Sequence, residues 1–333
     1  MDKLITFSVA AYNVEKYLPK LFDSIIDPII INNIEILIVD DGSSDKTVEI
    51  SKKYEKIYPD SVRVISKENG GHGSTINVGM REAKGKYFRA LDGDDWVNTP
   101  DLVKLVDRLE KTEADMVLTD FLTCYSNGRI VRETFRQLVD GMEYDFRDIV
   151  SKVNWMRYHT VIYKTSILKK HDIKLDEHCF YVDSEFMIFP IPYIKTLVYY
   201  NLAIYCYRYG DAGQSVSSSS RIKHSEDSYK VFESLAEMYK SLPDNISKEH
   251  RKYIEHGISG HCIWHYRTIM TFPKSREKKK ELIDYEKKIK NISREIYLGM
   301  EDYGKSSRLI KVMRRSNYRL YNIICTIKKI KNS

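Results

Sequence analysis

Three carboxylates lie together in the run Asp92-Gly93-Asp94-Asp95, directly after the apolar segment 87–91. An apolar run of this length that ends in polar residues is typical of a buried strand leaving a sheet. Carboxylates this crowded repel one another, and their oxygens are the ligands that a hard divalent cation prefers. The run therefore predicts a cation site that serves a phosphate-bearing ligand, and a solvated Asp/Gly turn is the alternative.

Polar residues also follow two earlier apolar runs. Segment 36–39 ends in Asp40-Asp41, and segment 4–11 ends in Ala11-Tyr12-Asn13. In open α/β sheets, ligands bind at the carboxyl ends of the strands. Because three runs deliver polar residues to this same kind of place, we expect one ligand site at that edge of the sheet.

The first 120 residues alternate between short apolar runs and amphipathic segments. We expect strands near 4–11, 35–40, 62–66, 86–91 and 115–119, and helices near 14–26, 44–57, 73–83 and 100–111. This alternation predicts an α/β fold with a mostly parallel central sheet. After Asp120 the pattern mixes short strands and helices, with a hairpin turn at 126–129.

Beyond residue 220 the sequence reads as helical with a lysine-rich surface. The serine run 217–220 predicts a loop or linker, which divides the chain into units 1–216 and 217–333. The length of 333 residues is ample for two such units. Within the first unit we separate residues 1–120 from residues 121–216, because the pattern changes there.

The composition indicates a cytoplasmic protein. The five cysteines are scattered and odd in number, which is typical of reduced thiols and not of a disulfide framework. No secretory signal is recognised at the amino end. The most apolar long stretch, 186–207, is interrupted by Pro190, Pro192 and Lys195, so we expect a buried helix and strand there and no membrane span.

The net charge of +7 is concentrated near the carboxyl end. Segment 303–333 holds nine Lys or Arg and no Asp or Glu, with apolar residues at roughly helical spacing. A basic amphipathic helix of this kind suits an anionic membrane surface, such as the inner face of the plasma membrane. The alternative is a helix that packs on its own domain. Nucleic acid is not expected as a partner, because base-stacking aromatics do not accompany the tail.

Taken in order, the polar segments resemble those of family 2 glycosyltransferases with the GT-A fold. That family's nucleotide-sugar domain opens with strand-Tyr-Asn, continues with Val-Asp-Asp-Gly-Ser-x-Asp-x-Thr, and reaches an Asp-x-Asp-Asp element. Here these segments are 11–13, 39–47 and 92–95, and Asn-x-Gly segments occur between them at 69–71 and 77–79. The resemblance implies a Rossmann-like GT-A domain over 1–216, followed by a helical carboxyl-terminal region. Within that domain, 1–120 would be the nucleotide-sugar half and 121–216 the acceptor half.

The resemblance also implies which residues bind the nucleotide. Ala11, Tyr12 and Asn13 would line the nucleoside pocket, and Asp40 or Asp41 would accept a hydrogen bond from the base or ribose.

Further along the chain, Asn69, Gly70 and Asn77 would contribute to the donor site, and Asp92 with Gly93 would meet the ribose side.

A divalent cation, Mn²⁺ or Mg²⁺, would be held by Asp94, with Asp92 as a second candidate ligand. His224 lies where GT-A enzymes often return a late residue to the metal or diphosphate, and it is a third candidate. The histidines at 256, 261 and 265 read instead as part of a packing face. His72, beside the glycines, is a candidate phosphate contact or a solvent-facing residue.

An inverting transfer needs a base that takes the proton from the acceptor hydroxyl. The family supplies an Asp from a Glu-Asp pair that begins a helix, and Asp183 matches it, with Val182 in place of the Glu. Glu185 is the rival. The alternative for both residues is helix N-terminal capping, which favours acids without any chemistry.

The resemblance implies transfer of one hexose or N-acetylhexosamine from a UDP-sugar. The acceptor would be a cell-surface glycan, a teichoic-acid-like polymer or a lipid-linked precursor. Ala10 and Thr75-Ile76 depart from the family pattern, and no Gln-x-x-Arg-Trp element is present, which argues against processive synthesis. A nucleotidyltransferase and a non-catalytic partner subunit are the other functions considered, and a homo-oligomer is left open.

Overall fold

The computed structural model describes residues 3–210 and 217–332, and the chain divides into two compact units, 1–211 and 212–333. The first unit is built on a ten-stranded sheet. Its strands are β1 (Ile5–Ala11), β2 (Ile34–Asp40), β3 (Val62–Ser66), β4 (Tyr87–Asp92), β5 (Trp96–Val97), β6 (Met116–Tyr125), β7 (Ile130–Glu133), β8 (Glu143–Asp145), β9 (Val161–Lys164) and β10 (Thr196–Tyr209).

The strand order is β3-β2-β1-β4-β9-β6-β10-β5, with β7 paired to β6 and β8 to β10. Strand β1 lies between β2 and β4 and is parallel to both. Strand β9 is antiparallel to β4 and β6, whereas β6 and β10 are parallel. The predicted α/β fold with a mostly parallel sheet is confirmed.

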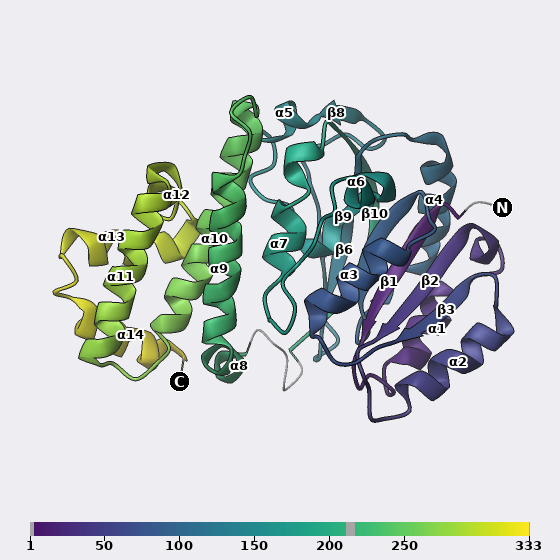
Figure 1. The fold of residues 1–333 in the computed structure, drawn as a ribbon, viewed down its shortest axis with the longest axis horizontal. Helices are drawn as coiled ribbons and strands as arrows, with labels where there is room; N and C mark the ends of the chain where they lie inside the picture. The colour runs from purple at the N-terminus through teal and green to yellow at the C-terminus, as the bar shows by residue number, and fades with distance from the viewer. Residues whose placement is uncertain (1–2, 211–216, 333) are drawn as a thin grey trace. The chain divides into compact units, whose positions relative to one another are not determined.

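Helices cover the sheet of the first unit (Figure 1). They are α1 (Leu18–Ile25), α2 (Thr47–Ile57), α3 (His72–Glu82), α4 (Thr99–Lys111), α5 (Phe146–Ile149), α6 (Thr165–Lys170) and α7 (Asp183–Ile188), with 3₁₀ turns η1 (Ile31–Asn33), η2 (Tyr158–Thr160) and η3 (Ile191–Tyr193). Helix α3 packs on β1 and β2, and α4 packs on β10. Every residue of β2 is buried, as expected for a strand covered on both faces.

A glycine lets α3 lie close to β1. A Cβ on Gly79 would come within 1.9 Å of Ser8 Oγ, so no larger residue fits there without movement. This close packing sets the position of the amino end of α3, at Gly71 and His72. That end therefore lies at the carboxyl edge of β1 and β2, where the candidate ligand residues gather.

The first helix begins later than the predicted residue 14. Asn13 has a positive φ of 53°. The next two backbone N–H groups donate to side chains near the start of α2. Val14 donates to Thr47 Oγ1, on the first residue of α2, and Glu15 donates to Asp45 Oδ2 in the loop before it. These long-range hydrogen bonds replace the helical ones, so α1 begins only at Leu18.

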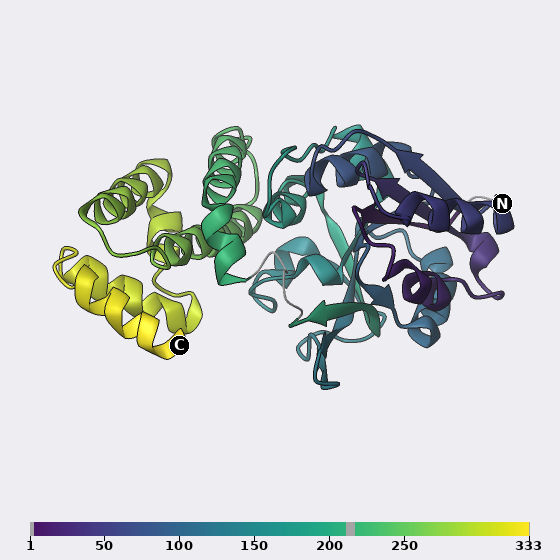
Figure 2. The ribbon, with the colours of Figure 1, turned by 90° about the horizontal axis from the view of Figure 1, so that it is seen from below.

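The second unit is helical, as predicted. Its helices are α8 (Ser218–Lys223), α9 (Ser225–Lys240), α10 (Lys248–Ile269), α11 (Arg276–Ile292), α12 (Arg294–Gly299), α13 (Gly304–Arg315) and α14 (Tyr321–Asn332). Helix α10 contacts α8, α9, α11 and α12 (Figure 2). The linker prediction for 217–220 is wrong in part, because Ser217 is the N-cap of α8 and accepts a hydrogen bond from Ser220 N–H.

The tail forms two helices, α13 and α14, where the sequence predicted one. Ile310 and Met313 are buried within the second unit. Arg314 donates to Glu286 at 2.8 Å and to Glu301 at 3.0 Å. Much of the tail therefore packs on its own unit, as the alternative interpretation proposed. Across the described residues, no helix is both long and apolar enough to cross a bilayer.

Candidate functional site

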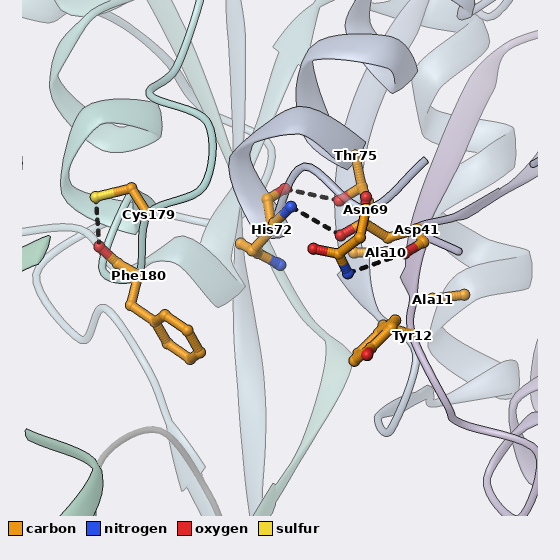
Figure 3. A pocket seen from close by; sticks show the side chains of 10 residues that line it. Ala10, Ala11, Tyr12, Asp41, Asn69, His72, Thr75, Cys179 and Phe180 are labelled. Atoms are coloured by element: carbon orange, nitrogen blue, oxygen red, sulfur yellow. Dashed lines mark hydrogen bonds between the residues drawn. The ribbon is translucent and has the colours of Figure 1, made fainter. Parts of the chain in front are cut away.

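A pocket of about 310 Å³ opens at the carboxyl edge of the sheet in the first unit. Its walls come from the ends of β1 and β2, the loop before α3, the first turn of α3 and the segment before α7. The lining residues are Ala10, Ala11, Tyr12, Asp41, Asn69, Gly71, His72, Thr75, Cys179 and Phe180. Tyr12 and Phe180 lie on opposite sides of the opening, with His72 between them (Figure 3). Of the predicted nucleotide residues, the pocket thus brings together Ala11, Tyr12, Asp41 and Asn69.

Asp41 organises the glycine loop beside the pocket. Its carboxylate accepts hydrogen bonds from Lys67 Nζ at 2.6 Å and from the N–H groups of Gly70 and Gly71 at 2.9 and 2.8 Å. The Asn69 amide donates to the Asp41 carbonyl at 3.0 Å. Asp41 is 3% exposed, so its carboxylate shapes the pocket wall and has little surface left for a ligand.

Two other predicted contact residues support the loops. Asp40 is buried and accepts from Ser43 N–H at 3.2 Å. Asn13 Oδ1 accepts from Ser44 N–H at 2.8 Å. Neither residue lines the pocket. The structure therefore gives both a local role in holding the loops that follow β1 and β2, and their contact with a nucleotide stays a prediction.

Asn77, a predicted donor-site residue, is held by hydrogen bonds to the backbone, and its role at the donor stays a prediction. Its amide donates to Leu175 O at 2.9 Å, and its Oδ1 accepts from Leu175 N–H at 2.8 Å. Both polar atoms of the side chain are thus used in joining α3 to the segment before α7. Asn77 holds the far wall of the pocket in place and does not line it.

Asp92 is the last residue of β4 and faces the inner end of the site. Tyr158 Oη donates to Asp92 Oδ1 at 3.3 Å, and the Asp92 N–H donates to Tyr205 Oη at 3.1 Å. Gly93 follows, and a Cβ there would lie 2.8 Å from Ala10 O. Gly93 is therefore required by the close approach to β1, and its contact with the donor stays a prediction.

Asp94 and Asp95 have different environments. Asp95 is buried, and its carboxylate accepts from Tyr205 Oη at 2.7 Å and from Arg208 N–H at 2.6 Å. Asp94 is half-buried, and its carbonyl accepts from Arg208 Nε at 2.9 Å. The buried Asp95 thus fixes the turn that presents Asp92 and Asp94.

The carboxylates raise one another's proton affinity. Desolvation raises the pKa of Asp92 to about 6; His72 opposes this shift, and the negative charges of Asp94 and Asp183 add to it. The pKa of Asp95 lies well above its usual range through desolvation and the charges of Asp92 and Asp94. A bound cation would relieve this mutual repulsion.

His72 links the pocket to two carboxylates. Its Nε2 lies 3.6 Å from Asp92 Oδ1 and 3.9 Å from Asp183 Oδ1. Asp183 is the first residue of α7, and its side chain is 59% exposed. Three segments far apart in the sequence therefore bring His72, Asp92 and Asp183 together at one end of the pocket.

The rival base, Glu185, points into the protein interior. It is fully buried, and its Oε2 accepts from Asp176 N–H at 2.8 Å. Because a base must reach a substrate hydroxyl, this burial favours Asp183 over Glu185.

The candidate metal ligands differ in position. His224 lies in the second unit at the junction of α8 and α9, with Nδ1 3.0 Å from Asp227 Oδ2, and its metal role stays a prediction. Within residues 3–210 and 217–332, no group of three or more His, Cys, Asp or Glu side chains is arranged to hold an ion. Mg²⁺ commonly uses only one or two protein carboxylates together with substrate phosphates. The repelling pair Asp92 and Asp94 fits that smaller ligand set.

Several residues of the site were not predicted from the sequence. Cys179 and Phe180 line the pocket, and Tyr158 and Tyr205 hold Asp92. Phe180 could have been proposed from the sequence, because it is an aromatic residue three positions before Asp183. The two tyrosines come from segments more than 60 residues away from Asp92, and no local motif marks them.

Comparisons with known proteins agree with this geometry. Residues 6–171 match the description "Glycosyl transferase family 2". The chain is 34% identical over 129 residues to the uncharacterized glycosyltransferase EpsJ of Bacillus subtilis, covering 39% of this chain and 37% of EpsJ. It is 26% identical over 231 residues to the poly(ribitol-phosphate) beta-N-acetylglucosaminyltransferase TarS of Staphylococcus aureus, covering 68% of this chain and 39% of TarS. The chain spans less than two thirds of the length of these curated relatives.

Solved structures show the same fold. S. aureus TarS 1–349 in complex with UDP-GlcNAc superposes with a TM-score of 0.67 at 19% identity, covering 94% of this chain and 92% of that one. A mannosyltransferase from Pyrobaculum calidifontis, in complex with GDP-Man and Mn²⁺, has a TM-score of 0.55 at 14% identity, covering 100% of this chain and 88% of that one. The chain therefore belongs to glycosyltransferase family 2, and its first unit has the GT-A fold.

Proposed function

We propose that this protein transfers one sugar from a UDP-sugar to a hydroxyl acceptor with inversion at the anomeric carbon. The observation that carries the proposal is the meeting of the pocket with His72, Asp92 and Asp183 at one end. A nucleotide in the pocket would direct its diphosphate and sugar toward these carboxylates. TarS, whose fold this chain shares, has been solved with UDP-GlcNAc, which supports UDP as the nucleotide.

The nucleoside would rest between the pocket's two exposed aromatic residues. Tyr12 is 53% exposed and Phe180 40% exposed, and they flank the opening (Figure 3). The hydrogen bonds from the Gly70 and Gly71 N–H groups to Asp41 hold the glycine loop in position beside this pocket. Helix α3 begins at His72, so its amino end would favour the negative diphosphate.

Asp94 and Asp92 would hold Mn²⁺ or Mg²⁺. Such a cation supplies charge neutralisation for the diphosphate that leaves. The raised pKa of Asp92 and the half-buried position of Asp94 are consistent with a site that gains from a bound cation. The Mn²⁺ in the structurally similar mannosyltransferase complex supports this choice of metal.

Asp183 would act as the base. As the acceptor oxygen forms its bond to the anomeric carbon, the bond from that carbon to the diphosphate oxygen breaks. The hydroxyl proton passes to the Asp183 carboxylate, and the nucleoside diphosphate departs with the bonding electrons. The exposed position of Asp183 leaves room for an acceptor.

The acceptor would be a cell-wall or cell-surface glycan, with one sugar added in each encounter. The printed names of two relatives support this class, TarS and the minor teichoic acid biosynthesis protein GgaB of B. subtilis. The missing Gln-x-x-Arg-Trp element argues for release after each transfer.

The carboxyl-terminal helices would also touch an anionic membrane surface. Val312 on α13 is 43% exposed and Ile323 on α14 is 57% exposed, and α13 also carries Arg308 and Arg315. Val312→Ser combined with Ile323→Ser should weaken binding to vesicles that contain phosphatidylserine. Ile130→Ser, at a 61% exposed position in the first unit, is the matched control. Equal vesicle binding by all variants would contradict membrane contact.

Nucleotide binding tests the pocket directly. Calorimetric titration should detect UDP, and Tyr12→Ala should weaken it by about 5- to 100-fold if the base stacks on the ring. Tyr193→Ala, which removes a 38% exposed tyrosine stacked on His171, should leave UDP affinity unchanged. If the wild type binds no nucleoside diphosphate, or binds UDP equally well without Tyr12, the pocket assignment is wrong.

A further inference from the structure

A strip of aromatic side chains leads away from the carboxylates along β10 and β6. Because side chains alternate between the faces of a strand, Tyr205, Tyr207 and Tyr209 share one face of β10. The parallel register sets Tyr205 beside Phe121 and Tyr209 beside Tyr125. We call these five residues, together with His159 of η2, the aromatic strip.

The rings of the aromatic strip are in contact from end to end. The His159 ring lies 4.8 Å from that of Tyr205 and 4.4 Å from that of Tyr207. Tyr207 and Tyr209 are 5.9 Å apart, and Tyr209 and Tyr125 are 5.3 Å apart, both edge to face. These spacings are typical of favourable aromatic pairs.

The inner end of the strip reaches the candidate catalytic carboxylates, and its outer end reaches solvent. Tyr205 is fully buried and contacts both Asp92 and Asp95, whereas Tyr209 is 40% exposed. Desolvation raises the pKa of Tyr207, and so do the nearby carboxylates, among them Asp183. The strip therefore begins at Asp92, which shares His72 with the proposed base Asp183, and it runs outward from there. The donor pocket does not include the strip.

Positive charge lies at two places along the strip, with Arg129 beside Tyr125 at the outer end and Arg157 beside Phe121 toward the inner end. The Arg129 guanidinium lies 5.4 Å from the centre of the Tyr125 ring, and that of Arg157 lies 5.9 Å from the centre of the Phe121 ring. Both arginines are exposed. Neither forms an ion pair within residues 3–210 and 217–332. Guanidinium groups in this position suit a ligand that bears phosphate.

We propose that the aromatic strip binds the acceptor, and that this acceptor is a chain of polyol or sugar units joined by phosphates. The C–H faces of the units would pack on Tyr207, Tyr209 and Tyr125, where ring contact and loss of water favour binding. The phosphates would meet Arg129 and Arg157. The terminal hydroxyl would then lie at Asp183. This inference rests on the transferase function proposed above and assigns its acceptor subsite.

Direct binding of an acceptor polymer tests the inference without any donor. Poly(ribitol phosphate) is titrated calorimetrically into the full-length protein, with UDP titrated separately as a measure of the donor pocket. Tyr209→Ala should weaken polymer binding about 2- to 10-fold, and Tyr209→Phe should keep it, because the ring provides the contact. Arg129→Gln should weaken binding and also reduce its dependence on salt. UDP affinity should stay at the wild-type value in all three variants.

Two substitutions elsewhere in the first unit are matched controls. Tyr193→Ala removes a tyrosine of similar exposure, and Arg81→Gln removes an exposed arginine near the distal end of α3. Both should bind the polymer as the wild type does. No binding of the polymer by the wild type, or equal binding by Tyr209→Ala, would overturn the inference.

Further outcomes test the phosphate-bearing acceptor, the aromatic strip and the donor pocket separately. If dextran, a neutral glycan, binds as tightly as the polymer and Arg129→Gln changes neither, the assignment of a phosphate-bearing acceptor is overturned. If UDP fails to bind the wild type while Tyr209→Ala still weakens polymer binding, the aromatic strip is supported and the proposed donor pocket fails. Unchanged polymer binding beside intact UDP binding rejects the strip alone.

Discussion

Replacing Asp183 by asparagine removes the proposed base while keeping the size of the side chain. The structure predicts a small effect on folding, because this side chain is 59% exposed and begins a short helix. Loss of the favourable charge at the amino end of α7 should cost about 0.3–1 kcal/mol of unfolding free energy. A general base contributes about 10²- to 10⁴-fold in rate, so the turnover number should fall by that factor.

The assay separates binding from chemistry. Release of UDP from the donor is followed at saturating acceptor, and UDP affinity is measured by calorimetry on the same preparations. Asp183→Asn should lose turnover while its UDP affinity stays close to the wild-type value, since Asp183 does not line the pocket.

Glu185→Gln is the matched control. It keeps an oxygen that can accept from Asp176 N–H, and the buried Glu185 has no route to the acceptor. Its turnover should therefore change much less than that of Asp183→Asn. A larger loss in Glu185→Gln would transfer the base role to Glu185, and parental rates in both variants would refute the site.

Three further outcomes are expected. Activity should vanish in EDTA and return with Mn²⁺ or Mg²⁺, and Asp94→Ala should abolish that return in a folded protein; full activity in EDTA would exclude the metal role. Burial lowers the pKa of His261 to about 4. Burial, together with the charges of His261 and Lys278, lowers the pKa of His265 to about 3. Both histidines are therefore neutral in the folded protein and take up protons when it unfolds below about pH 6.5. The free energy of unfolding should therefore decrease as the pH falls from 6.5 toward 4. In urea titrations at pH 7.5 and pH 5, the decrease in this free energy should be about 2 kcal/mol smaller for His265→Phe than for the wild type. Equal decreases would contradict this reasoning. Asn77→Ala should lower the free energy of unfolding by about 1–3 kcal/mol through its lost hydrogen bonds, and an unchanged urea midpoint would contradict its bridging role.

The strands that position the site could be predicted from the sequence because their signal is local. Apolar runs at 36–39 and 87–91 end in carboxylates, and the structure places both at one edge of the sheet. The beginning of α1 could not be predicted in this way. Its first turn is replaced by hydrogen bonds to Asp45 and Thr47, about 30 residues away in the sequence.

The roles of single polar residues were harder to predict than their location. Asn77 lies next to the pocket wall, but its partner Leu175 is 98 residues away, and no local pattern reveals that pairing. Likewise, the apolar spacing of the tail predicts helix but not what covers it. The ion pair between Arg314 and Glu286, which joins α13 to α11, appears only in the folded unit.

The most direct test of the account is a proton and phosphorus NMR time course of a nucleotide-sugar panel with the full-length protein, Mn²⁺ and an acceptor polymer. The account predicts that a UDP-sugar is consumed, that UDP appears in equal amount, and that the first product has the opposite anomeric configuration to the donor. Retention of configuration would contradict the base role of Asp183. Release of inorganic pyrophosphate, or no turnover of any nucleotide sugar by a protein that binds UDP, would contradict the proposed glycosyl transfer itself.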